Sequence, residues 1–137
     1  MVEIEPHDAW IFLAIARSDG AEWADFLGVA DHINVGTPTN EEIEGAVRRL
    51  VSCAWIRVDG NRFHLTSEGR RAFTNVGALE AFPRPQVAPC QRLLEARGAE
   101  VELACDWKLD VAAMKQAKHD YSKRMARVAQ QHRRPKA

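Results

Sequence analysis

The sequence of 137 residues lacks the features that most quickly place a protein in a membrane or outside the cell. It has no run of 18 or more apolar residues, so it predicts no membrane-spanning helix. Its first five residues include two acids and no base, whereas a signal peptide begins basic and continues apolar, so we expect no export. The three cysteines, Cys53, Cys90 and Cys105, form no Cys-x-x-Cys pair, which is typical of free thiols in a reducing compartment. We therefore expect a cytoplasmic protein.

Motifs for catalysis and cofactor binding are also missing. The sequence has no glycine-rich phosphate loop, no Rossmann fingerprint, no His-Glu-x-x-His and no Gly-x-Ser-x-Gly. The histidines stand singly, without metal-ligand spacing to a cysteine; they are His7, His32, His64, His119 and His132. Cys53 falls near the end of an expected helix, where a small core residue is favoured over a nucleophile. We therefore expect no enzyme, no cofactor and no metal site.

An excess of charge is missing as well, because the 19 basic and 19 acidic residues cancel. A neutral chain argues against an obviously basic nucleic-acid binder. The balance is nevertheless uneven along the chain. Residues 1–82 carry seven arginines and no lysine against thirteen acidic residues, a net charge of −6, whereas residues 83–137 carry twelve basic and six acidic residues, a net charge of +6. The relative placement of the two parts therefore decides which partners the surface attracts.

The first half of the chain predicts a mainly α fold with a small β-hairpin. Apolar residues at helical spacing indicate helices over residues 9–17, with Asp8 as the N-cap, and over 22–33. Thr39-x-x-Glu42 is a capping box that starts a third helix over 40–53. Two short alternating segments flank Asp59-Gly60, which predicts a hairpin, and Thr66 can cap a helix over 67–75. The expected order is three helices, a hairpin and a helix.

The second half predicts a C-terminal helical extension over residues 90–131. Prolines favour a linker over 83–89, and a short helix is expected over 90–97. Residues 101–109 place apolar side chains at alternate positions, which favours a half-buried strand, with a helix as the alternative. A long helix is expected over 110–130, followed by a basic tail over 132–137.

Three segments together carry a resemblance to a known family. They are Thr39-x-x-Glu42-Ile43-x-x-Ala46-Val47-x-x-Leu50-Val51, the strand Trp55-Ile56-Arg57-Val58 with its Asp59-Gly60 tip, and Leu65-Thr66-Ser67-Glu68-Gly69-Arg70. Over residues 7–75 the chain resembles the winged helix-turn-helix domain of bacterial regulators of the MarR and PadR kind. The resemblance implies a winged-helix domain over 1–82, with the third helix lying in the DNA major groove. The chain departs from the family at Ala54, where a glycine usually ends the third helix.

The resemblance implies a set of candidate contacts to double-stranded DNA. The third helix supplies side chains for base edges, and the hairpin and the long helix supply cations for phosphates. These residues are Asn40, Arg48, Arg49, Arg57, Arg62, Lys123, Arg124 and Arg127. Glu41 and Glu44 lie on the same helix and repel phosphates, so acids that complement the helix dipole are the favoured interpretation there.

The long helix carries an apolar stripe that we expect to pack on the core or on a second copy in a homodimer. Its members are Val111, Met114, Tyr121, Met125 and Val128. The sequence thus supports two hypotheses. The first is a small winged-helix regulator of transcription that binds DNA. The second is a winged-helix protein-interaction module without specific DNA binding, favoured by the acids and by the net charge of −6.

Overall fold

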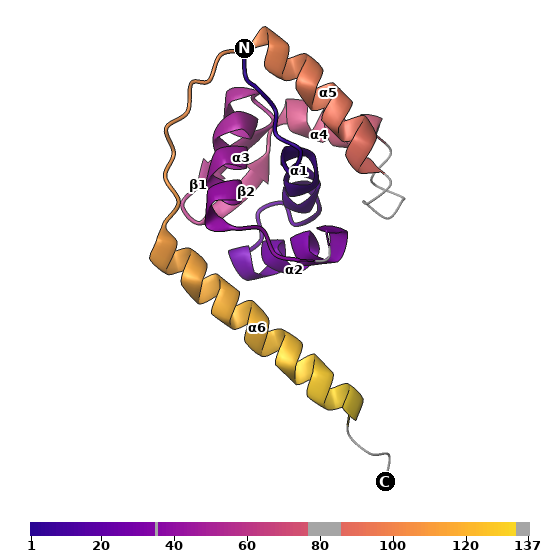
Figure 1. The fold of residues 1–137 in the computed structure, drawn as a ribbon, viewed down its shortest axis with the longest axis vertical. Coiled ribbons are helices and arrows are strands. Elements are labelled where there is room, and N and C mark those ends of the chain that lie inside the picture. Colours follow the sequence, from indigo (N-terminus) through magenta and orange to yellow (C-terminus); the bar gives the residue numbers. More distant parts are fainter. Residues whose placement is uncertain (35, 77–85, 134–137) are drawn as a thin grey trace.

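A computed structural model describes residues 1–34, 36–76 and 86–133 of the chain (Figure 1). The part described is mainly helical, with one two-stranded antiparallel sheet. The elements are α1 (Asp8–Arg17), α2 (Trp23–Asn34), α3 (Asn40–Ser52), β1 (Ile56–Asp59), β2 (Arg62–Leu65), α4 (Ser67–Asn75), α5 (Val87–Glu100) and α6 (Val111–Arg133). The predicted fold class, mainly α with a small hairpin and a C-terminal helical extension, is confirmed.

Helix α1 forms the centre of the core. Its residues from Asp8 to Ala16 are all buried, because the sequence there is apolar on nearly every face. It packs against α2, α3, α4, α5 and β2. The core therefore includes α5, which lies outside the domain predicted over residues 1–82.

Helix α3 begins and ends with identifiable hydrogen bonds. The capping box is present: the Glu42 amide donates to Thr39 Oγ1 at 3.1 Å, and the Thr39 amide donates to Glu42 Oε1 at 2.9 Å. At the other end, the amide of Ala54 donates to the Val51 carbonyl and that of Trp55 to the Leu50 carbonyl, the pattern of a Schellman motif. Ala54 holds the left-handed position of this motif, with φ of 62°.

The hairpin pairs Ile56 with Leu65 and Asp59 with Arg62, and Gly60 has the positive φ of 59° that its tight turn needs. Helix α4 then starts at the predicted cap, where Thr66 Oγ1 accepts from the Gly69 amide at 3.0 Å. Gly69 lies so close to the hairpin that a Cβ there would come within 1.9 Å of the Trp55 carbonyl oxygen. The Leu-Thr-x-x-Gly-Arg segment is therefore a packing motif between α4 and the start of β1.

Both helices of the second half differ from the prediction in their bounds. Helix α5 begins at Val87, inside the segment predicted as a linker, and ends at Glu100, three residues past the predicted end. Its Cys90 and Leu94 are buried in the core, which explains the longer helix. Helix α6 begins one residue later than expected and continues to Arg133. Residues 83–85 of the predicted linker and 134–137 of the predicted tail lie outside the described residues.

The predicted strand over 101–109 is wrong. Residues 101–110, which we call the strap, form neither a strand nor a helix and cross from the end of α5 to the start of α6 along α3 (Figure 1). The predicted alternation is present from Cys105 onwards: Trp107 is half-buried and Leu109 is buried, while Asp106, Lys108 and Asp110 are exposed. The strap pairs with the side chains of a helix rather than with a neighbouring strand, so no sheet forms.

Candidate functional site

The outward face of α3 is covered by the strap. Glu44, Arg48 and Ser52 follow one another at intervals of four residues and therefore share one face of the helix. Ser52 Oγ accepts from the Ala104 amide at 3.0 Å, Arg48 Nε donates to the Trp107 carbonyl at 2.7 Å, and Glu44 Oε2 accepts from the Leu109 amide at 2.8 Å. Three successive turns of α3 thus each bond the main chain of the strap.

Helix α6 extends this cover to the start of α3. Lys118 Nζ donates to Asn40 Oδ1 at 3.1 Å, one turn before Glu44. Of the thirteen residues of α3, all of which the structure describes, only Glu41 is exposed, and it carries a negative charge. The predicted base-reading residues Asn40 and Arg48 are therefore engaged within the chain, and the face they share is closed to a DNA groove.

Apolar side chains anchor the strap on either side of these hydrogen bonds. The Trp107 ring lies edge-on to the rings of Trp23 and Phe63, at centroid distances of 6.5 and 5.8 Å. Leu109 is 7% exposed and belongs to the core. No signal in the sequence indicated that Glu44 and Ser52 contact this segment, whereas the alternation over 101–109 placed Trp107 and Leu109 on its covered side.

Arg49, the third predicted base reader, has a structural role. Its Nε and Nη2 donate to the two carboxylate oxygens of Asp8 at 2.6 and 2.9 Å, and Asp8 is completely buried. Asp8 is the first residue of α1, whose N-cap is His7, and its carboxylate also accepts from the Glu5 amide at 2.9 Å. The prediction of Asp8 as a simple N-cap is therefore wrong, because its carboxylate instead links α1 to α3.

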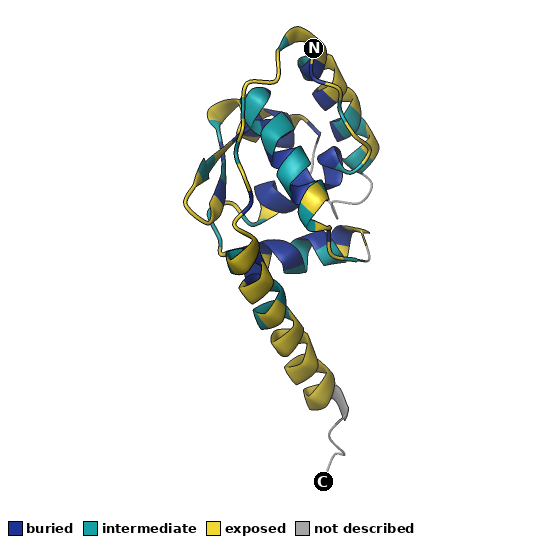
Figure 2. Cartoon of the chain, turned by 60° about the vertical axis from the view of Figure 1, so that its left-hand side comes forward, coloured by how far each residue is buried: buried dark blue, intermediate teal, exposed yellow. Residues whose placement is uncertain are grey.

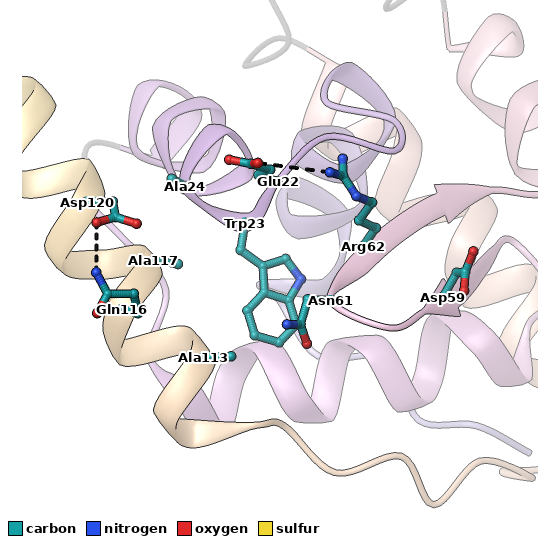
Figure 3. Close-up of a pocket in the computed structure, with 10 residues that line it drawn as sticks. All are labelled: Glu22, Trp23, Ala24, Asp59, Asn61, Arg62, Ala113, Gln116, Ala117 and Asp120. Atoms are coloured by element: carbon teal, nitrogen blue, oxygen red, sulfur yellow. Dashed lines mark hydrogen bonds and ion pairs between the residues drawn. The ribbon is translucent and has the colours of Figure 1, made fainter.

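The hairpin offers less positive charge than the sequence suggests. Arg57 is exposed on β1. Arg62 donates to the Gly20 carbonyl at 2.6 Å and lies 4.0 Å from Glu22, at the rim of a cavity of about 450 Å³ (Figure 3). This cavity also contains Asp59 and Asp120, so carboxylates outnumber cations in its lining. Such a lining repels phosphate, which leaves Arg57 as the free cation of the described hairpin residues.

The predicted apolar stripe of α6 divides into two parts. Met114 is fully buried against the core, and the Tyr121 hydroxyl donates to the Asp31 carboxylate of α2. The Tyr121 ring approaches α2 closely, because at Gly28 no Cβ stands in its way. Burial, together with this hydrogen bond to Asp31, raises the pKa of Tyr121 to about 12. These two residues hold α6 on the body of its own chain. Met114 is therefore not available for the dimer interface predicted from the sequence.

The second half of α6 extends away from the body (Figure 2). Residues 122–131, which we call the arm, are all exposed. Met125 and Val128 continue the apolar stripe on the arm and are 48% and 44% exposed. Lys123 and Arg127 are exposed beside them, and Arg124 Nη1 donates to Asp25 of α2 at 2.6 Å. Val111, at the start of α6, is 61% exposed. The arm thus combines two large apolar side chains with three cations and no acid.

Burial sets the protonation state of two of the three cysteines. Burial raises the pKa of the Cys53 thiol to about 11 and that of Cys90 to about 12, which keeps both protonated. Among the residues that the structure describes, no group of three or more His, Cys, Asp or Glu side chains is placed to hold a metal ion. No helix in the described ranges is long and apolar enough to cross a membrane.

Comparison with family models, with curated proteins and with solved structures found no match to this chain. The resemblance to winged-helix regulators therefore stays a prediction from sequence. The candidate functional surfaces are the strap-covered face of α3 and the exposed arm.

Proposed function

We propose that this chain is a cytoplasmic winged-helix protein-interaction module that makes its external contacts through the arm of α6. The observation that carries the proposal is the closure of α3, whose outward face is bonded by the strap and by Lys118 along its whole length. A recognition helix has to place its side chains against base edges, and here the only exposed side chain of α3 is Glu41. Three unpaired cysteines are consistent with the cytoplasm.

The partner in this proposal is a second copy of the chain. Met125 and Val128 are exposed on the arm, whereas Met114 and Tyr121 of the same stripe pack on the body, so a second apolar surface would cover them. The arm is positive and residues 1–82 have a net charge of −6, so the arm of one copy is attracted to the body of another. Two arms alone repel each other, which favours contact between arm and body over a simple pair of arms.

The oligomeric state of the full chain tests this proposal. Light scattering after size exclusion is expected to give a dimer for the parent and a monomer for Met125→Glu combined with Val128→Glu. The matched control is Ser122→Glu with Gln130→Glu, which adds the same two charges to exposed arm positions outside the apolar stripe. A parent that stays monomeric at 100 μM, or a control that dissociates as fully as the stripe variant, contradicts the proposal.

DNA binding is the second candidate, and the observation that favours it is the accumulation of cations on the arm. Lys123 and Arg127 are exposed with no acid within the arm, so they are available to phosphates. This binding would be insensitive to sequence and would weaken steeply with salt, because it depends on the release of counterions. A bacterial regulator that binds in this way would need a further element for specificity.

Duplex titrations at several salt concentrations separate the two candidates. If the arm binds phosphates, Lys123→Gln with Arg127→Gln lowers affinity at every sequence and reduces the salt slope by about two. If α3 reads bases, Arg48→Gln is the variant that loses affinity. No detectable binding of the full chain at low salt excludes DNA binding and leaves the interaction module.

A further inference from the structure

The contacts between α3 and the strap have the form of peptide recognition. The side chains of Ser52, Arg48 and Glu44 bond main-chain groups of the strap, two amides and one carbonyl. Main-chain groups are common to every peptide, so these three contacts require an extended segment but no particular sequence. Glu44 and Arg48 also lie 3.3 Å apart, which orients both side chains toward the bound segment.

Sequence selectivity at this face comes from two adjoining apolar positions. The Trp107 side chain meets the rings of Trp23 and Phe63, and Leu109 inserts into the core two residues later. The residues on either side of them, Asp106, Lys108 and Asp110, are exposed. The face therefore selects an extended segment that has an aromatic and an aliphatic side chain two residues apart.

Both ends of helix α3 are capped by hydrogen bonds that do not involve the strap. Its first turn is closed by the Thr39 and Glu42 capping box, and its last turn by the bond from the Trp55 amide to the Leu50 carbonyl. Its inward face packs through Ile43, Val47 and Leu50, all fully buried. The side chains that bond the strap are thus presented by a helix that is already formed.

We propose that the outward face of α3 is a binding site for an extended peptide with an aromatic residue followed two positions later by an aliphatic one, and that residues 104–109 occupy it as an internal ligand. The partner is a protein segment of this chemistry. This site goes beyond the proposed function, since it lies on a different surface from the arm. A tethered segment is present at an effective concentration of about millimolar or more, so the strap excludes weaker ligands and yields only to a stronger one.

A peptide-binding measurement tests the site in the full chain. The probe is a fluorescent peptide of residues 102–111 with serine in place of Cys105, titrated by anisotropy. The variant Trp107→Ser with Leu109→Ser weakens the internal ligand, so it is expected to bind the probe at least tenfold more tightly than the parent does. A second probe with serine at both apolar positions is expected to show no binding to either protein.

Further substitutions locate the binding on α3. Arg48→Ala with Ser52→Ala in the same background is expected to reduce probe affinity by tenfold or more, whereas Glu41→Ala, on α3 but away from the strap, is expected to leave it unchanged. A variant that keeps the circular dichroism of the parent but does not bind the probe overturns the proposal. So does a folded variant that binds duplex DNA and not the peptide.

If the Trp107→Ser and Leu109→Ser variant does not fold, hydrogen exchange in the parent chain tests whether the strap can leave α3. The amides of Ala104 and Leu109 donate to side chains of α3, so their exchange reports release of the strap. We expect them to exchange at least tenfold faster than the buried amides of α3, and excess probe peptide to accelerate them further by trapping the open form. Exchange at the rate of α3, unaffected by the peptide, refutes an exchangeable strap.

Discussion

Ala54 adopts a left-handed conformation that L-residues other than glycine rarely take. Its φ of 62° closes the Schellman motif after α3, where the resembling family usually has glycine. The Cβ of an L-residue in this conformation costs roughly 1–2 kcal/mol. The backbone around it is held by the bonds from the Ala54 and Trp55 amides to α3, and by the Thr66 hydroxyl, which donates to the Ala54 carbonyl at 2.5 Å.

We therefore expect Ala54→Gly to stabilise the protein. The relief of backbone strain exceeds the added entropy of glycine in the unfolded chain, so the free energy of unfolding rises by about 0.5–1 kcal/mol. Urea denaturation followed by circular dichroism measures the change. Ala54→Val is the opposite test and is expected to destabilise, because a branched side chain worsens the strain. If the glycine variant is less stable than the parent, the strain argument fails.

The pair of Asp8 and Arg49 leads to a second prediction at the residue scale. Arg49→Ala leaves the fully buried Asp8 carboxylate without its cation, and breaking a buried pair in this way costs about 3–5 kcal/mol. Thermal and urea unfolding measure the loss. Arg57→Ala, on an exposed strand position, is the matched control and should change stability by less than about 0.5 kcal/mol.

Replacing both members of this pair separates the two possible causes of the loss. Asp8→Asn combined with Arg49→Met removes the buried charge together with its partner, so stability is expected to recover in part. If the double variant is as unstable as Arg49→Ala, the loss of stability comes from the packing of the arginine stem and not from the unpaired carboxylate.

Local hydrogen bonding was predictable from the sequence, whereas long-range pairing of the same residue types was not. The Thr39 and Thr66 caps each bond an amide three residues away, so a window of four letters contains the whole interaction. Arg48 and Arg49 instead bond groups 59 and 41 positions away. Their spacing along α3 is the same whether they contact DNA, the strap or a buried aspartate, and only the fold decides among these.

At the scale of elements, the spacing of apolar residues correctly predicted which side of a segment is covered. It did not predict which other element covers that side. The alternation over 105–109 is present, but the main chain of this segment bonds side chains of α3 and not another strand. The stripe of α6 is likewise present, but Met114 is buried on its own chain while Met125 is 48% exposed. The spacing of apolar residues is a property of one segment, so it does not show which element that segment packs against or how far the contact extends.

Docking of α6 on α2 has a spectroscopic signature, because Tyr121 is the only tyrosine of the chain. Burial and the bond to Asp31 raise its pKa to about 12 from the ordinary value of 10. The folded protein therefore keeps the proton between pH 10 and 12, where the unfolded chain has lost it. The contribution of this contact to stability is complete below pH 10 and declines as the pH rises to 12.

Absorbance of tyrosinate near 295 nm measures this titration directly. The parent is expected to have its midpoint near pH 12, and Asp31→Ala is expected to shift the midpoint down toward 10, because it removes both the hydrogen bond and the negative charge. Asp25→Ala, which removes the partner of Arg124 on the same helix, is the control and should leave the midpoint in place. A parent midpoint near 10 would mean that α6 is not docked.

At the scale of the whole molecule, the net charge is zero, but the excess negative and the excess positive charge lie in different parts of the chain. Within the basic part of the chain, residues 83–137, helix α5 lies on the core, whereas the arm extends away from the body and carries three cations and no acid. Only Arg124 of the arm is paired with the body among the described contacts, through Asp25. The arm therefore adds little to the stability of a single chain and most of its surface is available to another.

A chain that ends at Arg124 tests this separation of stability from association. Residues 125–131 are exposed, so at 1 μM, where the parent is expected to be monomeric, the shortened chain should melt within about 3 °C of it. At 100 μM the melting temperature of the parent is expected to rise, because dimerisation stabilises the folded form by mass action, while that of the shortened chain stays constant. Scanning calorimetry at both concentrations measures the difference. An equal rise in both chains would place the contact between copies on the body and not on the arm, whereas a lower melting temperature of the shortened chain at 1 μM would show that the arm packs on its own body.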